Sequence, residues 1–169
     1  MFRSRSLIAA MLPFVAMLSA RTKPSLESRI QRLEDIEEIR VVLTDYGRFL
    51  DARDFRAYAR LFAKDGEWVG GFGTVRGPAA IQTFMEKNIP GPNTAHNYHL
   101  LSNFEIAVHG DTATAWSRWT FVVPGPDRKP AMAQGGRYED LLIRENGQWK
   151  FRRREAFNDL PSSGPVQTK

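Results

Sequence analysis

A histidine, an aspartate and a tyrosine are the side chains of this chain best suited to acid–base chemistry. His99 falls in the middle of a predicted strand, where it shares a face with Leu101 and Asn103. A histidine on an inward strand face can act as a general base when a carboxylate lies nearby, because the carboxylate fixes the ring tautomer and stabilises the imidazolium. The same position also suits a core histidine whose hydrogen bonds are simply satisfied.

Tyr46 and Asp51 stand five residues apart near the end of a predicted helix. This spacing places them on neighbouring faces of adjacent turns, with Tyr46 on the apolar stripe, so the tyrosine hydroxyl lies where water is scarce. The alternative is a core tyrosine with one hydrogen bond and an aspartate that caps the next helix. His96 lies on the opposite strand face beside a loop and is the second candidate base, while His109 falls in a turn.

The composition argues against several other kinds of site. The 169-residue chain has no cysteine and three dispersed histidines, so it lacks thiolate ligands and the spacing of a histidine metal site. It shows no glycine-rich phosphate loop and no nicotinamide fingerprint, and we expect neither a metal nor a cofactor. The net charge of +5 comes from scattered basic residues, and the run Arg152–Arg154 is expected to be a solvated strand end rather than a nucleic-acid contact.

Three helices are predicted to position these residues. From Ser25 to Leu50 apolar residues recur at three- and four-residue steps, which is typical of a long amphipathic helix that Ser25 caps. Asp54 is expected to cap a short second helix with one apolar face, formed by Phe55, Tyr58, Leu61 and Phe62. A third helix follows Pro78.

The remaining pattern predicts strands. A short bent strand is expected at 66–75, and four longer antiparallel strands follow at 96–108, 112–123, 135–143 and 148–157. Helices followed by a meander of strands indicate an α+β fold, in which about three N-terminal helices wrap a curved antiparallel or mixed sheet into a cone-shaped barrel. Such a cone leaves an apolar pocket, which is a usual kind of small-ligand site.

The first twenty residues form a separate part. A positively charged start precedes an apolar stretch, Leu7–Leu18, that ends in small residues, which predicts a signal peptide cleaved after Ala20. The stretch is too short to cross a bilayer of ~30 Å hydrocarbon. We therefore expect one domain over residues 21–160, a flexible tail over 161–169, and a periplasmic or secreted protein without a membrane anchor. A leader that is not a signal would leave the protein in the cytoplasm.

Short motifs are spread over the stretch from Ile30 to Phe157. They are Tyr46 with Leu50-Asp51-Ala52-Arg53-Asp54, Leu61-Phe62 with Asp65, Gly73 to Gly77, His99-Leu100-Leu101-Ser102-Asn103, Gly110-Asp111, and Asn146-Gly147-Gln148-Trp149. With these motifs the chain resembles the SnoaL-like branch of the nuclear transport factor 2-like superfamily. The resemblance covers most of the mature chain and implies the cone-shaped α+β fold.

Known enzymes of that branch include scytalone dehydratase, bile-acid dehydratase and hexachlorocyclohexane dehydrochlorinase, which eliminate a leaving group without a cofactor. The resemblance implies that Asp51 and His99 form a catalytic pair, and that Tyr46 completes a triad similar to that of the bile-acid enzyme. It also implies a catalytic arginine, which maps to Arg144, with Arg137 as the other candidate. The second histidine of the scytalone enzyme has no counterpart near positions 119–121, where this chain is aromatic.

Together these observations predict a cofactor-independent lyase of the dehydratase, dehydrohalogenase or C–C lyase type. Its substrate would be a hydrophobic cyclic or aromatic small molecule. His99 would take a proton, Asp51 would orient the ring of His99, and Tyr46 would hydrogen-bond the leaving group or the developing anion. Six further side chains are expected to line the substrate pocket: Trp68, Phe72, Asn103, Trp119, Phe121 and Tyr138.

Two other functions fit the same residues. An isomerase like ketosteroid isomerase would use the carboxylate of Asp51 as its proton shuttle. A non-catalytic, exported small-ligand-binding protein would keep the aromatic pocket and give His99 and Asp51 only structural roles. Trp116, on the predicted convex sheet face, indicates a contact surface. The resemblance implies that this face forms a homodimer or homotrimer.

Overall fold

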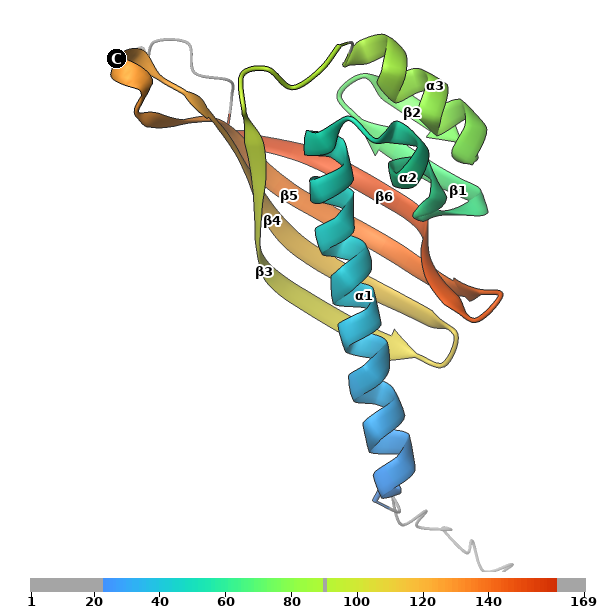
Figure 1. Cartoon of the computed structure of the whole chain (residues 1–169). Coiled ribbons are helices and arrows are strands. Elements are labelled where there is room, and N and C mark those ends of the chain that lie inside the picture. Colours follow the sequence, from blue (N-terminus) through green and yellow to red (C-terminus); the bar gives the residue numbers. More distant parts are fainter. Residues whose placement is uncertain (1–22, 90, 161–169) are drawn as a thin grey trace, which may run out of the picture.

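The computed structural model describes residues 23–89 and 91–160, which form a curved sheet with helices on one face (Figure 1). The helices are α1 Leu26–Ala52, α2 Phe55–Arg60 and α3 Pro78–Asn88, with a 3₁₀ turn, η1, at Pro126–Arg128. The strands are β1 Phe62–Gly70, β2 Gly73–Arg76, β3 Tyr98–His109, β4 Thr112–Pro124, β5 Pro130–Glu145 and β6 Gln148–Leu160. The predicted α+β fold is confirmed.

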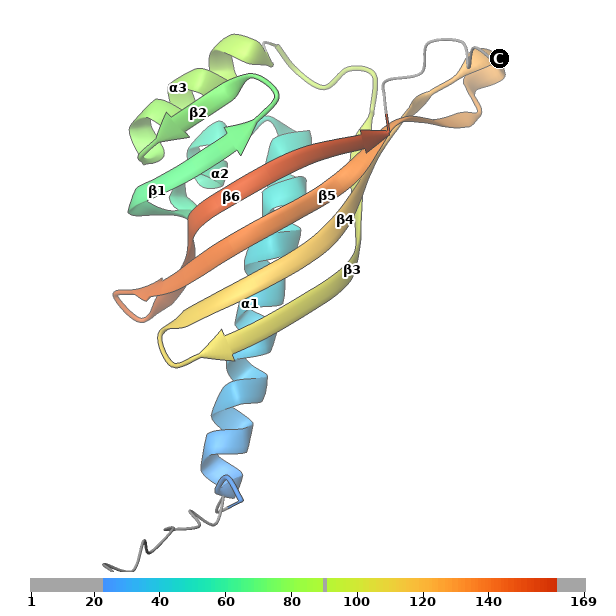
Figure 2. The same ribbon diagram turned by 180° about the vertical axis from the view of Figure 1, so that it is seen from behind.

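The sheet is mixed and has the strand order β2-β1-β6-β5-β4-β3 (Figure 2). Strands β3 to β6 pair as an antiparallel meander, while β1 lies parallel to β6 and antiparallel to β2. Within the described residues β2 and β3 are the two edges, so the cone is open rather than closed into a barrel. Two strands extend further than predicted, since β5 begins at Pro130 and β6 ends at Leu160.

Helix α1 packs across the face of the sheet that the helices cover, and it extends beyond the edge of the sheet (Figures 1 and 2). Ser25 caps it as predicted, because its Oγ accepts the Ser28 backbone N–H at 3.2 Å. The first turns project away from the sheet, where Leu26 and Leu33 are each 67% exposed. The apolar stripe therefore packs against the core only along the later turns, through Ile39, Leu43, Tyr46 and Leu50.

The chain departs from the prediction just after the second helix. Helix α2 ends at Arg60 and Phe62 begins β1, because the Leu61 carbonyl accepts the Phe151 backbone N–H at 2.8 Å and starts the parallel pairing with β6. The segment expected to be one bent strand at 66–75 instead contains most of the β1–β2 hairpin.

Gly47 lies where α1 approaches β3 closely. A Cβ atom at this position would lie 2.7 Å from Leu101 Cδ1, so a larger residue would require the Leu101 side chain or the helix to shift. Asp51 follows about one helical turn later. The close approach at Gly47 thus brings the end of α1 beside the start of β3.

The predicted signal peptide at 1–20 and the tail at 161–169 lie outside the described residues, so cleavage after Ala20 stays a prediction. In the two segments that the structure describes, no helix is both long enough and apolar enough to span a membrane.

Candidate active site

A cavity of about 460 Å³ lies between the helices and the sheet, at the end of α1 that carries Tyr46. Its walls come from all three helices and from strands β1 and β3 to β6. Five of the six predicted lining residues contribute to it: Trp68, Phe72, Trp119, Phe121 and Tyr138. Phe72 is 74% exposed and so lies at the rim. A separate hollow of about 490 Å³ surrounds Trp116 and does not include His99.

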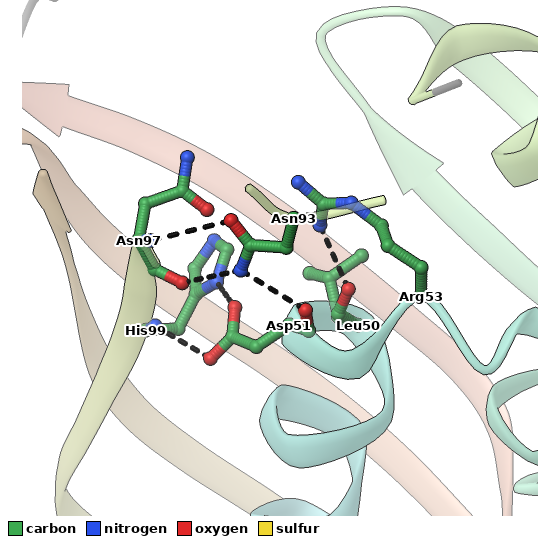
Figure 3. A network of polar contacts seen from close by, with 6 residues as sticks. All are labelled: Leu50, Asp51, Arg53, Asn93, Asn97 and His99. Carbon is green, nitrogen blue, oxygen red and sulfur yellow. Dashed lines mark hydrogen bonds and ion pairs between the residues drawn. The ribbon is translucent and has the colours of Figure 1, made fainter. Parts of the chain in front are cut away.

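Asp51 and His99 are in direct contact (Figure 3). Asp51 Oδ1 lies 2.6 Å from His99 Nδ1, and Oδ2 accepts the His99 backbone N–H at 2.8 Å. An ionised carboxylate can only accept, so in a neutral ring this contact selects the tautomer in which Nδ1 carries the proton and Nε2 keeps a lone pair. The side chains of His99 and Asp51 are 15% and 18% exposed, and His99 lines the cavity. The pair therefore has the form of a general base with its orienting carboxylate.

The side chain of Asn93 links the loop before β3 to the end of α1 through hydrogen bonds (Figure 3). Its Nδ2 donates to the carbonyl of Asp51 at 3.0 Å and to that of Asn97 at 2.7 Å. Its Oδ1 accepts the Asn97 backbone N–H at 3.2 Å. Backbone contacts on both sides thus support the alignment of Asp51 with His99.

Aromatic rings surround the imidazole of His99. The centroid of Phe121 lies 4.7 Å from that of His99, and the centroid of Trp119 lies 6.1 Å away. The other two histidines are exposed: His96 is in the loop before β3, and His109 ends that strand. His99 is consequently the histidine that lines the cavity.

Three tyrosines cluster on the cavity wall. Tyr46 Oη accepts the Trp68 Nε1–H at 3.0 Å, which leaves the hydroxyl hydrogen of Tyr46 available for another acceptor. The rings of Tyr58 and Tyr138 have centroids 4.7 Å and 5.3 Å from that of Tyr46. Burial, and then the nearby Tyr46, raise the pKa of both Tyr58 and Tyr138 well above the usual value. Both phenols therefore stay neutral.

A buried ion pair lies against these tyrosines. Arg154 donates from Nε and Nη2 to the two carboxylate oxygens of Asp140 at 2.9 Å and 3.0 Å. Its guanidinium carbon lies 3.9 Å from the ring centroid of Tyr46 and 4.1 Å from that of Tyr138. Burial raises the pKa of Asp140 to about 6, against the opposing effect of Arg154. The carboxyl is thus ionised at neutral pH.

The expectation that Arg152–Arg154 is a solvated strand end is wrong for Arg154, which is fully buried. The physical reason is a β-bulge between β5 and β6, where Leu142 pairs with Phe151 and Leu141 pairs with Arg153. Arg152 is skipped in this pairing, so Arg154 turns inward. In the sequence, the inward-facing Asp140 could have indicated that a basic residue is buried beside it, because a buried carboxylate needs a partner.

Two predicted site residues lie outside the cavity. Asn103 is exposed within a bulge of β3, with φ 55, and Phe104 turns towards the core in its place. Strict strand alternation predicted the opposite arrangement. Arg144 is bonded to Asp35 on α1, which lies ~24 Å from Asp51 along the helix axis. Neither residue lines the cavity.

The other candidate arginine, Arg137, also lies elsewhere. It donates to Glu139 at 2.9 Å and lies over the ring of Phe157 at 4.0 Å. Among the described residues, the arginine on the cavity wall is Arg53, which sequence reasoning did not single out. Its position two residues after Asp51 is the sequence feature that could have indicated a place near the site.

The lining of the cavity is short of anionic groups. Within residues 23–89 and 91–160 no aspartate or glutamate lines it, and no cluster of three histidine, cysteine or acidic side chains is placed to hold a metal ion. The lining carries one imidazole, one guanidinium and neutral phenols in an aromatic wall. Such a site can move a proton at His99 Nε2 and donate hydrogen bonds to an oxygen.

An open cone of helices over a curved sheet is the fold of small nuclear transport factor 2-like proteins. The chain belongs to the SnoaL-like domain family, whose model matches residues 31–155. A nuclear transport factor 2-like protein with a cystatin-like fold from Novosphingobium aromaticivorans is similar at 29% identity. The match covers 78% of this chain and 86% of that one, with a TM-score of 0.69. The predicted resemblance is confirmed.

Two further structures from the same organism are similar. A protein provisionally assigned as an aromatic ring hydroxylase shares 25% identity over 79% of this chain and 95% of its own, with a TM-score of 0.66. A protein provisionally assigned as a scytalone dehydratase shares 23% identity over 82% and 97%, with a TM-score of 0.62, which shows a common fold. No match was found among curated proteins.

Proposed function

We propose that this protein is a cofactor-independent lyase that eliminates a leaving group, such as water, from a hydrophobic cyclic or aromatic small molecule. The contact of 2.6 Å between Asp51 Oδ1 and His99 Nδ1, at the wall of an aromatic cavity, carries the proposal. The SnoaL-like family includes cofactor-independent dehydratases and cyclases, which supports small-molecule chemistry.

In the elimination, His99 Nε2 takes a proton from a substrate carbon. The electrons of that C–H bond form a new double bond, and the bond from the neighbouring carbon to the leaving oxygen breaks. Asp51 stabilises the imidazolium, which can then return its proton to the leaving hydroxyl so that water departs. The step balances without a further reactant, and His99 ends neutral.

Tyr46 is suited to assist the departing or developing negative charge. Its oxygen already accepts from Trp68, so its own hydroxyl hydrogen can be donated to a substrate oxygen. The ring of Tyr46 is held from behind by the guanidinium of Arg154. A rigid donor of this kind stabilises charge without having to reorganise.

The geometry favours His99 over Asp51 as the group that touches the substrate. Both oxygens of Asp51 are engaged, one by the ring and one by the backbone of His99. An isomerase of the ketosteroid type would need a carboxylate oxygen facing the substrate. Asp51 is therefore assigned a positioning role.

The experiment is a turnover screen with cyclic alcohols and aryl ethers, in which products are identified by mass. His99→Ala should lower turnover by about 10²–10⁴-fold, the usual contribution of a general base, while the melting temperature stays close to that of the wild type. His96→Ala, at an exposed histidine, is the matched control. Unchanged turnover in His99→Ala would remove the mechanism. Ligand binding without turnover by the wild type would favour a binding protein.

We also propose that the protein is exported and that it self-associates through the outer face of the sheet. Trp116 lies on the outer face of β4 with the guanidinium of Arg118 at 5.2 Å from its ring, and Leu141 on β5 is exposed. These groups support a homodimer or homotrimer through that sheet face. Light scattering of the mature protein tests this, with a monomer as the contradicting result.

A further inference from the structure

We propose that Arg53 binds an anionic group of the substrate, so that the natural ligand is an aromatic or cyclic carboxylate. The inference rests on the proposed use of the cavity as a substrate site and names the chemical class that the site takes. It is carried by the position of Arg53, by its unused hydrogen-bond donors and by the charges around it.

Arg53 is held at the cavity wall directly after α1. Its backbone has φ 59, and its N–H and its Nη1 both donate to the carbonyl of Leu50, at 3.2 Å and 2.8 Å (Figure 3). A guanidinium has five N–H donors, and the bond to Leu50 uses one. Arg53 Nε is buried and has no partner among the described residues. The side chain is therefore anchored at Nη1, and because Nε is buried, the donors left for a ligand are the remaining N–H groups of Nη1 and Nη2.

The charge of Arg53 is not balanced by a neighbouring acid. In the described part of the chain no carboxylate lies within 4.0 Å of its guanidinium. The two aspartates that flank it in sequence are used elsewhere: Asp51 holds His99, and Asp54 Oδ1 accepts the Ala57 backbone N–H at 2.9 Å. A half-buried cation without a counter-ion favours an anionic ligand.

Other arginines of comparable or deeper burial show the contrast. Arg144 is bonded to Asp35, Arg153 lies 2.8 Å from Glu155, and Arg154 holds Asp140. The fold thus neutralises its packed arginines except at the cavity. No acidic side chain of the described residues lines the cavity, and the nearby Asp51 is paired with His99, so Arg53 is the unpaired charge that an entering anion would meet.

A carboxylate fits better than a larger or more highly charged group. A guanidinium pairs with a carboxylate in a fork geometry, and the single positive charge of Arg53 balances a monoanion but not a phosphate dianion. The remaining wall, including Trp68, Trp119 and Phe121, suits a ring. With its carboxylate at Arg53, the ring of the ligand would lie in the aromatic part of the cavity that also presents His99.

The test compares 2-naphthoate with 2-naphthamide, which have the same shape but differ in charge at neutral pH. Calorimetric titration of the wild type should show naphthoate binding about 10- to 100-fold tighter, as expected for charge-assisted hydrogen bonds. Arg53→Met should abolish this ratio while leaving the affinity for naphthamide within about threefold of the wild type. Arg53→Lys should keep part of the ratio, and Arg56→Gln, at an exposed arginine on α2, should keep all of it.

Equal affinity of the wild type for the two ligands would overturn the inference, as would failure to bind either one at millimolar concentration. This comparison needs no variant, so it stands even if Arg53→Met folds poorly. Equal weakening of both ligands in a folded Arg53→Met protein would also overturn it, because Arg53 would then only shape the cavity. Naphthoate preference in a protein without turnover would leave the inference intact and refute the lyase.

Discussion

Two aspartates of this protein, Asp140 and Asp51, each pair with a basic side chain, yet the surroundings of the two pairs differ. Asp140 grips Arg154 where both side chains are fully buried, whereas Asp51 grips His99 at the cavity wall, where both remain partly exposed. The partner of Asp140 is an arginine, which stays protonated, so this ion pair does not change with proton transfer. The partner of Asp51 can gain and lose a proton. In the proposed function, the first pair holds the site in shape and the second takes part in the proton transfer.

The largest effect on stability is expected from breaking the buried pair. Asp140→Ala should lower the free energy of unfolding by about 3–5 kcal/mol, because it leaves the guanidinium of Arg154 buried without an acceptor. Denaturant unfolding measures this. The exposed Asp65→Ala serves as the control.

A double variant sharpens the same prediction. Asp140→Leu with Arg154→Met should be more stable than Asp140→Ala, because no unpaired charge is then buried. A single variant as stable as the wild type would show that the pair does not support the fold.

At the reactive pair we expect a loss of activity with little loss of stability. Asp51→Asn should lower turnover by about 10²-fold, near the lower end of what a general base contributes, because the amide no longer secures the Nδ1–H tautomer of His99. The measurement is kcat on a substrate found in the screen. Asp45→Asn, at another partly exposed aspartate of α1 that is paired with Arg48, is the matched control.

This prediction also separates the two enzyme mechanisms. If Asp51→Asn removed far more activity than His99→Ala, the carboxylate rather than the imidazole would be the proton carrier. The isomerase would then be favoured over the lyase.

The smallest effect belongs to a third pair, Asp35 with Arg144, far from the cavity. Burial raises the pKa of Asp35, but hydrogen bonds from Arg144 and Gln31 outweigh this and hold it below its usual value of 3.8. A lowered folded-state pKa contributes stability above the usual value, and this contribution is lost as the pH falls through the folded-state value.

Asp35→Asn should therefore cost ~1 kcal/mol of unfolding free energy at pH 7, and the difference from the wild type should shrink below pH ~3.8. Thermal unfolding at several pH values checks this, with Glu34→Gln as an exposed control. A difference that persists at low pH would mean that Asp35 acts by packing alone.

The elements that carry the dyad were predictable because each has a strong periodic pattern. The apolar steps of α1 place Tyr46 inward and Asp51 at the helix end, and the alternation of early β3 turns His99 towards the helices. Contact between Asp51 and His99 came only from the family resemblance, because sequence spacing says little about residues 48 apart. The structure supplies that contact directly.

The misplaced residues share one physical cause. Asn103 and Arg154 lie in or beyond bulges, where one extra residue reverses which face a side chain takes. The alternation of polar and apolar residues in one sequence does not reveal where such a register shift occurs. Arg144 was misplaced for a different reason, since a position counted from a motif does not reveal which end of α1 the side chain meets.

The proposed mechanism depends most directly on the protonation of the His99 ring. Histidine ¹⁵N spectra of the wild type at neutral pH should show Nδ1 protonated and Nε2 unprotonated, and Asp51→Asn should change this pattern. That result would establish a lone pair on the nitrogen left for the substrate. A proton on Nε2 in the wild type, or a pattern unaffected by Asp51→Asn, would contradict the assignment of His99 as the general base.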